Sequence, residues 1–389
     1  MSGSLPDIRC GIGDYTARLA AQLARRPGVS VCVLTSQNDR IRLDAAAPAE
    51  VVSQARWGVA DLPELLRVID RYAPDVIHIQ YPAVGYGRRL GIVLLPLVAR
   101  RLRRLPTVLT IHERRERRWA ARFAINFMAL ASTKVVTLDP VETASLVQAI
   151  PQMSRKVVTG RMISTIALAA NVDRSAWRTR LGAAADDFIL VTFGLIHPRR
   201  RVEDIIDAVA ELRRLNVRVR LLVVGGEAEY DPDIARAYSL QLRDRAHSLG
   251  LDGVIDWMDH VAADEVSACL QSADVAVLLY PEGASDRNTT LRAALEHGLP
   301  VVTTIGAATS DSLRHQVGII YVSAGRYTAA DLAQAVRKAL TIGSDASRAA
   351  TDKSNLEQQV DFHLDLYDSV AQRRTPDRRS NASLKGPNQ

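Results

Sequence analysis

The chain has 389 residues, of which 47% are hydrophobic and 24% charged, so its composition is globular and its length predicts two or three domains. No run of about 18 apolar residues is present that would span a bilayer, and the first residues lack the basic and then apolar pattern of a signal peptide. The three cysteines, Cys10, Cys32 and Cys269, have neither metal-binding nor disulfide spacing. We therefore expect a cytoplasmic protein.

Apolar strands alternate with longer helical patterns along almost the whole chain, which predicts two doubly wound parallel-sheet domains of the α/β class. The expected strands are Val29–Ser36, Asp75–Gln80, Thr107–His112 and Lys134–Leu138 in the first half, and Asp187–Gly194, Arg218–Gly226, Val254–Met258, Val275–Tyr280 and Pro300–Thr304 in the second. We place the change of domain near Asn171–Gly182 and expect a disordered tail from Arg373.

The first candidate loop carries Gly11 and Gly13 just before a helix predicted over Asp14–Arg26, which Asp14 or Thr16 would cap. Glycine has no Cβ, so such a loop lets backbone N–H groups approach a ligand closely. The third glycine of the dinucleotide fingerprint is missing. A simple turn followed by a helix cap explains the segment equally well.

The net charge of +7 is unevenly distributed. Between Arg88 and Arg122 eleven Arg side chains stand against two Glu side chains, a local excess of nine positive charges. The helical patterns Gly91–Leu105 and Glu113–Ala131 mix these Arg residues with large apolar ones. This suits peripheral contact with an anionic membrane, at its inner face, and it suits equally a solvated Arg face over an apolar core. Nucleic acid is not expected, because no groove-reading motif or stacking platform accompanies the charge.

His112 and Glu113 stand at the carboxyl end of the expected strand Thr107–His112. A lone histidine in such a place is more often structural than catalytic. The strand end, however, is where open α/β sheets present their ligand-binding groups. His78, which lies inside a strand, is interpreted as a core residue.

Three consecutive arginines, Arg199–Arg201, follow Gly194 at the end of the first strand of the second half. This too is the ligand-facing edge of an open α/β sheet, and the planar guanidinium binds two phosphate oxygens at once. The alternative is a solvated run of charge.

A polar loop lies between the strand that ends at Tyr280 and the helical pattern that begins at Leu291. Hydroxyls, a guanidinium and backbone N–H groups gather there at a helix N-terminus, which favours a phosphate or diphosphate. An ordinary Asn or Thr helix cap is the competing interpretation. The residues concerned are Gly283, Ser285, Arg287, Asn288, Thr289 and Thr290.

Taken together, these segments resemble the GT-B-type nucleotide-sugar glycosyltransferases, most closely glycosyltransferase family 4. The matching stretches occur in the family's order from about Cys10 to Val370: CGIGDYTARLAAQLA, DVIHIQYPAVGYG, TVLTIHE, FGLIHPRRRVEDIIDAVAEL, LLVVGG, GASDRNTTLRAALEHGLPVVTT and FHLDLYDSV. The resemblance implies two Rossmann-like domains facing a central crevice: an acceptor-side domain over 1–172, a nucleotide-sugar domain over 173–355, a terminal helix over 356–372 that crosses back to the first domain, and a tail over 373–389.

The resemblance also implies roles for individual residues. Arg200 stands where family members usually carry the Lys that binds the donor diphosphate. Their second basic residue is replaced here by Leu195, directly after Gly194, and Arg287 is expected to supply the missing charge. Gly11 and Gly13 are expected to face the diphosphate or the acceptor, and His112 to lie near the transferred sugar.

One departure concerns the paired glutamates of typical members, the second of which holds the ribose hydroxyls. At those positions this chain has Ser285 and Ala293. Glu296, one helical turn later, and Glu282, at the start of the loop, are the two candidates for a substitute. The sequence therefore defines the fold better than it defines the identity of the donor.

The resulting expectation is a metal-independent, retaining glycosyltransferase that uses a nucleotide-diphosphate sugar as donor substrate and no cofactor. No Asp-x-Asp triplet favours a metal-bound diphosphate. The acceptor is a small molecule, a glycan or a lipid-linked hydroxyl compound. The alternative is a non-catalytic sugar-nucleotide-binding or partner subunit on the same fold, which the loss of both glutamates favours.

Overall fold

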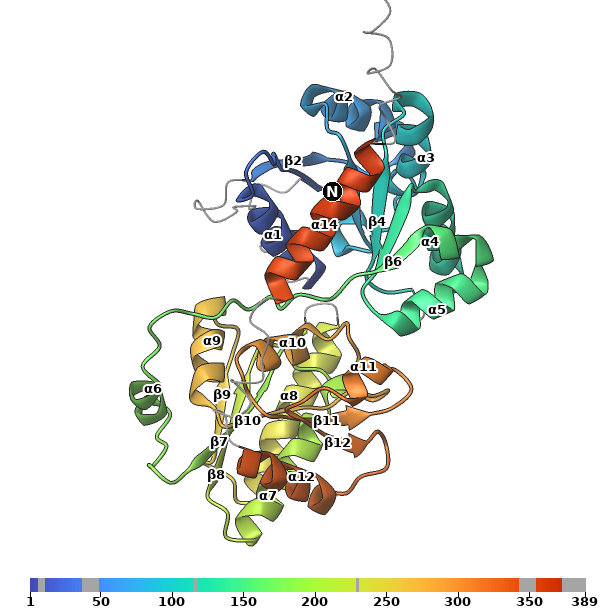
Figure 1. Cartoon of the computed structure of the whole chain (residues 1–389). Helices are drawn as coiled ribbons and strands as arrows, with labels where there is room; N and C mark the ends of the chain where they lie inside the picture. Colours follow the sequence, from blue (N-terminus) through green and yellow to red (C-terminus); the bar gives the residue numbers. More distant parts are fainter. Residues whose placement is uncertain (6–10, 37–48, 115–117, 229–230, 343–354, 373–389) are drawn as a thin grey trace, which may run out of the picture. The chain divides into compact units, whose positions relative to one another are not determined.

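The computed structural model describes residues 1–5, 11–36, 49–114, 118–228, 231–342 and 355–372 (Figure 1). They form two compact units: unit 1 comprises Met1–Arg161 with the segment from Leu356, and unit 2 comprises Met162–Asn355. The tail predicted over 373–389 lies outside the described residues. None of the described helices combines the length and the apolar character that a membrane crossing requires.

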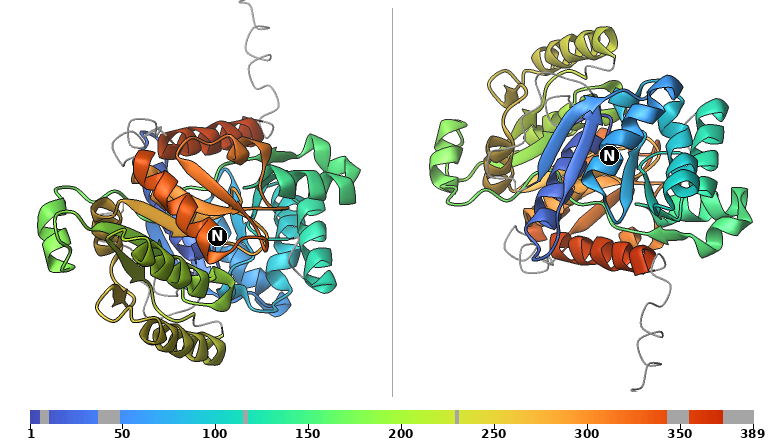
Figure 2. Two further views of the ribbon diagram at one scale, coloured as in Figure 1. Left: turned by 90° about the horizontal axis from the view of Figure 1, so that it is seen from below. Right: turned by 90° about the horizontal axis from the view of Figure 1, so that it is seen from above.

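Unit 1 contains parallel strands in two sheets, flanked by helices (Figures 1 and 2). One sheet pairs β1 (Cys32–Ser36) with β2 (Glu50–Ala55), and the other has the order β3 (Ile77–Tyr81), β4 (Thr107–Ile111), β5 (Lys134–Thr137), β6 (Val157–Thr159). The helices are α1 (Gly11–Ala24), α2 (Leu62–Tyr72), α3 (Gly91–Arg103), α4 (Trp119–Ala131), α5 (Pro140–Ala149) and α14 (Asn355–Ala371). Every residue of β4 is buried, as expected for a parallel strand that is covered on both faces.

Helix α14 (red in Figure 1) packs against the strands of unit 1 although it lies far from them in the sequence. The Tyr367 hydroxyl is 2.6 Å from Nδ1 of His78 on β3, and Gln359 accepts a hydrogen bond of 3.0 Å from the backbone N–H of Arg161. His78 also contacts Thr110 at 2.6 Å, and the loss of solvent around its ring lowers its pKa well below the ordinary value. It is therefore a neutral core residue.

The buried His363 of α14 gives a testable pH dependence. Its Nδ1 lies 2.7 Å from the carbonyl of Gln359, and burial lowers its pKa from 6.5 to about 4. Between these pH values the unfolded chain binds a proton that the folded chain does not, so stability falls as the pH falls from 6.5 toward 4. Wild type should therefore lose about 2 kcal/mol of unfolding free energy relative to His363→Leu between pH 7 and 4.5. Urea unfolding at both pH values measures this difference, with the exposed His260→Leu as the control. A pH-independent difference would contradict it.

Unit 2 contains one six-stranded parallel sheet in the order β12-β11-β10-β7-β8-β9. Its strands are β7 (Phe188–Phe193), β8 (Val219–Val224), β9 (Ile255–Met258), β10 (Val275–Leu278), β11 (Val301–Ile305) and β12 (Ile319–Ser323). Its helices are α6 (Arg174–Arg180), α7 (Val202–Arg214), α8 (Pro232–Ser248), α9 (Ala263–Ser272), α10 (Thr289–Glu296), α11 (Asp311–Arg314) and α12 (Ala329–Ile342). The chain moves outward from β7 through β8 to β9 and then returns to β10 on the other side of β7, so the strand order reverses between β7 and β10.

The two units divide between Arg161 and Met162, whereas the sequence suggested a change of domain near residue 172. The intervening segment is tied to unit 2 by backbone contacts. The N–H of Ser164 donates to Glu296 at 3.3 Å, and the N–H of Ala169 donates to the Ser267 hydroxyl at 2.8 Å. These contacts join residues about a hundred positions apart, so local sequence patterns carry no sign of them.

Candidate functional site

The candidate donor site lies in unit 2, where the strand order reverses. Gly194 follows β7, and Tyr280 and the polar loop follow β10, the strand paired with β7. Open α/β sheets bind ligands at the carboxyl ends of the strands between which the strand order reverses. Arg200, at the end of a short 3-10 helix (Pro198–Arg200), and helix α10 therefore start from the same edge.

Arg200 and Thr290 come together at this edge. Nη1 of Arg200 is 3.3 Å from the Thr290 hydroxyl, which in turn is 2.8 Å from the hydroxyl of Tyr280. The Arg200 guanidinium also lies 5.7 Å from the centroid of the Tyr280 ring, within the range of a cation–π contact. Burial raises the pKa of Tyr280, so its hydroxyl stays protonated. Tyr280 is a site residue that the sequence analysis read only as the end of a strand.

Gly194 shapes the space around this cluster. Its φ of +115° is a backbone conformation that side chains rarely adopt. A Cβ here would also come within 3.1 Å of Nη2 of Arg200 and 3.2 Å of Cγ2 of Thr290. Glycine is therefore needed both for the turn after β7 and for the close approach of the guanidinium.

The polar loop before α10 is held by Asn288 and Ser285. Asn288 is the N-cap residue, but its side-chain oxygen accepts from the N–H of Ser285 at 2.7 Å and from its hydroxyl at 3.3 Å, instead of capping the helix. Thr289 and Thr290 begin the helix, so their N–H groups have no partner in the helix ladder. Helix α10 thus begins directly after the polar loop, and the binding of an anion at its start stays a prediction.

The other predicted residues of unit 2 fall in different places. Arg287 is half-buried in the loop before α10. Arg199 is exposed, and Arg201 pairs with Asp204 at 2.9 Å, so of the three consecutive arginines only Arg200 joins the cluster. Glu296 is the last residue of α10, about 9 Å along the helix from Thr290. The structure therefore does not bring Glu296 together with Arg200.

A largely buried ion pair that the sequence did not predict fixes the same loop. Arg292 of α10 lies 2.5 Å from the carboxylate of Asp286, which also accepts a hydrogen bond from the Ser310 hydroxyl. Asp286 stands in the loop and Arg292 in the helix, so their spacing is not one of the helical intervals at which side chains meet. No sequence signal could have paired them.

In unit 1 the structure places His112 directly after β4. Its ring Nε2 is 2.8 Å from the side-chain oxygen of Gln80, and its backbone N–H donates to the carbonyl of Tyr81 at 2.9 Å. The Tyr15 ring packs edge-on against the His112 ring, with 5.1 Å between the two ring centroids. His112 is buried, so these contacts orient its ring. Gln80 and Tyr15 are partners that strand and helix patterns alone could not identify.

Gly11 and Gly13 require a correction. The prediction put them in a loop before a helix at Asp14, whereas helix α1 begins at Gly11 and includes both. A Cβ on Gly13 would come within 3.1 Å of the carbonyl of Ser4, while one on Gly11 would meet none of the described residues within 4 Å. Gly13 therefore serves the close packing of the helix start on residues 4–5. Asp14 sits in the first turn, where burial raises its pKa to about 6.

Among the residues that the structure describes, no three His, Cys, Asp or Glu side chains gather in a way that could hold a metal ion. The sites described above present guanidinium groups, hydroxyls and helix N–H groups instead.

Comparison with known proteins identifies the family. Residues 10–159 match the family described as "Glycosyl transferase 4-like domain", and residues 187–341 match "Glycosyl transferases group 1". The chain belongs to the GT-B glycosyltransferases. Two solved structures align over nearly the whole chain. A glycosyltransferase from Rickettsia africae has a TM-score of 0.74 at 12% identity, and the alignment covers 94% of this chain and 97% of that protein. Anabaena HepE in complex with UDP and glucose has a TM-score of 0.63 at 17% identity and covers 94% of both chains.

One curated relative is the D-inositol 3-phosphate glycosyltransferase of Stackebrandtia nassauensis, which is 29% identical over 229 residues. The alignment covers 55% of this chain and 49% of that protein, so the match spans about half the length of the relative. A second D-inositol 3-phosphate glycosyltransferase, from Geodermatophilus obscurus, is 27% identical over 207 residues, or 51% of this chain and 44% of that protein.

Proposed function

We propose that this GT-B protein transfers a sugar from a nucleoside-diphosphate sugar to a hydroxyl acceptor. The observation that carries the proposal is the meeting of Arg200, Thr290 and Gly194 at the carboxyl edge of unit 2, beside the start of α10. A fixed guanidinium and free helix N–H groups at one point suit a diphosphate. HepE, whose structure holds UDP and glucose, makes UDP-glucose the first donor to test.

The chemistry that this site would perform is stabilisation of the leaving group. As the bond from the sugar to the diphosphate breaks, negative charge grows on the departing phosphate oxygen. Arg200, with Arg287 from the neighbouring loop, would neutralise that charge, and the N–H groups at Thr289–Thr290 would donate to it. In unit 1, His112 is proposed to contact the transferred sugar, oriented by Gln80. We further propose that the anomeric configuration is retained, as the family resemblance implies.

Transfer by purified protein across a panel of nucleotide sugars tests the proposal. The acceptors should include free inositol phosphates, sugar phosphates and lipid-linked glycans, because the curated relatives are named for an inositol phosphate acceptor. Product formation with at least one pair is expected. Binding of a nucleotide sugar without hydrolysis or transfer for any donor would favour the non-catalytic alternative instead.

Activity should not require a divalent metal. The proposed leaving-group stabilisation uses arginine charges, and the described residues hold no cluster of metal-ligating side chains. Treatment with EDTA is therefore expected to leave the transfer rate within about twofold, since fixed protein charges are not removed by chelation. Loss of activity with EDTA and its return with Mg²⁺ or Mn²⁺ would overturn this mechanism.

We also propose peripheral contact between unit 1 and an anionic membrane. Helices α3 and α4 pack together and expose large apolar side chains: Trp119 is 81% exposed, Phe123 71% and Leu102 63%. Arg88, Arg89, Arg100, Arg101, Arg103, Arg104, Arg118 and Arg122 are exposed on or beside the same helices. Arg114 does not belong to this surface because it is buried, and Arg115 and Arg117 lie outside the described residues.

The membrane contact has its own test. Vesicles with anionic lipid should bind the protein at low salt, with about 1 kcal/mol per basic residue near the surface, and release it as salt rises. The double variant Trp119→Ser/Phe123→Ser should bind several-fold more weakly, because the apolar insertion is lost. Leu240→Ser, at a 58%-exposed position of α8, is the matched control. Protein that stays in the supernatant at low salt would exclude this contact and favour a soluble acceptor.

A further inference from the structure

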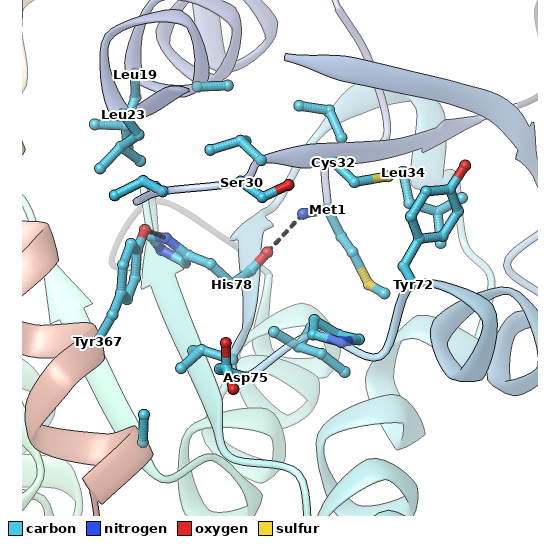
Figure 3. A pocket seen from close by; sticks show the side chains of 18 of the residues that line it. Met1, Leu19, Leu23, Ser30, Cys32, Leu34, Tyr72, Asp75, His78 and Tyr367 are labelled. Carbon is cyan, nitrogen blue, oxygen red and sulfur yellow. Dashed lines mark hydrogen bonds between the residues drawn. The ribbon is translucent and has the colours of Figure 1, made fainter. Parts of the chain in front are cut away.

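A row of hydrogen-bonded side chains connects helix α14 to His112 within unit 1. The hydroxyl of Tyr367 on α14 lies 2.6 Å from Nδ1 of His78 on β3, and Figure 3 shows this hydroxyl beside the ring. Nε2 of the same ring lies 2.6 Å from the hydroxyl of Thr110 on β4 and 3.2 Å from the amide nitrogen of Gln80. The amide oxygen of Gln80 lies 2.8 Å from Nε2 of His112. We call Tyr367, His78, Gln80 and His112 the hydrogen-bond row.

The positions of the hydrogens along this row depend on one another. Gln80, Thr110 and His112 are buried, and buried polar groups in folded proteins are paired. Each hydrogen bond needs one donor and one acceptor, and a neutral imidazole offers one nitrogen of each kind. The direction of one bond in the row therefore fixes the direction of the next.

The direction is set at His78. Loss of solvent lowers the pKa of His78 well below its ordinary value, so at neutral pH one ring nitrogen carries a hydrogen and the other is bare. Thr110 is fully buried, and within the described residues its hydroxyl is hydrogen-bonded to Nε2 of His78. Only a bare Nε2 accepts the hydrogen of this hydroxyl, and a buried hydrogen without an acceptor is costly. Nδ1 of His78 therefore carries the hydrogen and donates it to Tyr367.

The same direction continues to His112. A bare Nε2 on His78 attracts the amide nitrogen of Gln80, which only donates, and repels the amide oxygen, which only accepts. The oxygen of Gln80 is thus held toward His112. Nε2 of His112 has to donate to this oxygen, so in the neutral ring the hydrogen is on Nε2 and Nδ1 is bare.

We propose that Gln80, His78 and Tyr367 are positioning residues, which fix the hydrogen of His112 on Nε2 and so make Nδ1 an acceptor for a hydroxyl of the transferred sugar. The part played by Nδ1 rests on the proposed function, in which His112 contacts that sugar. Gln80 alone would not select one nitrogen, because its amide can turn over and offer either end to His112. His78, held by Tyr367 and Thr110, removes this freedom.

Nitrogen-15 NMR of the histidine rings of the full chain measures the position of the hydrogen directly. The spectra are recorded without donor or acceptor, about two pH units above the ordinary histidine pKa, so that the rings are neutral. His112→Asn identifies the signals of His112, which should show the hydrogen almost entirely on Nε2. Gln80→Met removes the acceptor and should lower the ratio of the Nε2–H to the Nδ1–H form at least about fivefold. Tyr367→Phe removes the acceptor for Nδ1 of His78 and should lower the same ratio at least about threefold.

Two further variants separate the row from a general loss of packing. Tyr321→Phe in unit 2 removes a hydroxyl that donates to the carbonyl of Leu313, and as the matched control it should leave the ratio unchanged. In Gln80→Glu an ionised carboxylate presents an oxygen at both ends, so His112 should keep its hydrogen on Nε2 with or without Tyr367→Phe.

A hydrogen on Nδ1 of His112 in the wild type would overturn the proposal, and so would a ratio that either Gln80→Met or Tyr367→Phe leaves unchanged. The NMR measurement contains no sugar donor, so it does not depend on glycosyl transfer. Failure of the row and failure of the proposed activity are therefore distinguishable.

Discussion

Replacing Arg200 with alanine should weaken the binding of a nucleoside diphosphate by about tenfold to a hundredfold and lower turnover. Hydrogen bonds to a charged group contribute roughly 1.5–3 kcal/mol, and about 1.4 kcal/mol corresponds to a factor of ten. Arg200 is held beside Thr290 and Tyr280, so its guanidinium is oriented before the ligand arrives. Arg287→Ala should have an effect of the same kind, because Arg287 stands in the loop that leads into α10. Calorimetric titration with UDP measures both.

Two further variants separate charge from geometry at this position. Arg200→Lys keeps the charge but loses the planar pair of N–H donors, so it should recover only part of the affinity. Arg199→Ala removes an exposed arginine from the same turn and should leave affinity within about twofold. Unchanged affinity in a folded Arg200→Ala protein, or equal losses in Arg199→Ala and Arg200→Ala, would show that the diphosphate binds elsewhere.

Replacing Arg114 with methionine should lower the unfolding free energy by about 3 kcal/mol, since the partners of its guanidinium lose their hydrogen bonds and the buried Glu142 carboxylate loses a nearby positive charge. Only 1% of Arg114 is exposed; its Nε donates to Asn126 at 2.8 Å and its Nη1 to Ser145 at 3.3 Å. Burial lowers the pKa of Arg114, and the nearby carboxylate of Glu142, which is also buried, opposes this effect. Urea unfolding followed by circular dichroism measures the loss, with the exposed Arg101→Met as the control.

A double variant checks the cause of that loss. In Arg114→Met/Glu142→Leu both charges are replaced by apolar side chains, and buried pairs replaced in this way often cost little stability. We expect the double variant to recover at least about half of the loss caused by Arg114→Met. If the two single losses simply add, the two residues do not interact and the destabilisation comes from lost packing alone.

The sequence predicted the main β-α alternation because buried parallel strands are continuous apolar runs, as in β4 and β7. It did not predict β2, β6 or β12, whose residues are only partly buried or whose runs are short. The sequence also did not predict the order of the strands in the sheet, since the reversal between β7 and β10 depends on contacts between distant segments.

In the candidate site, too, the sequence predicted some residues and not others. Arg200 and the start of α10 could be found because they follow strands directly, where function is expected in this type of sheet. Tyr280 and the Asp286–Arg292 pair could not, because aromatic and charged residues at loop boundaries are common and their partners are set by the tertiary structure. Helix α1 shows the limit of local rules, because Gly13 in its first turn serves the close packing on residues 4–5 instead of a loop.

Helix α14 has a consequence for the order in which the protein is made. The residues that cover His78 in unit 1 come after all of unit 2 in the chain, so they leave the ribosome after unit 2 has been synthesised. Unit 2, whose segments are continuous in the sequence, can fold as soon as it emerges, while unit 1 waits for its last helix. The half of the protein that is synthesised first is therefore the half that is completed last.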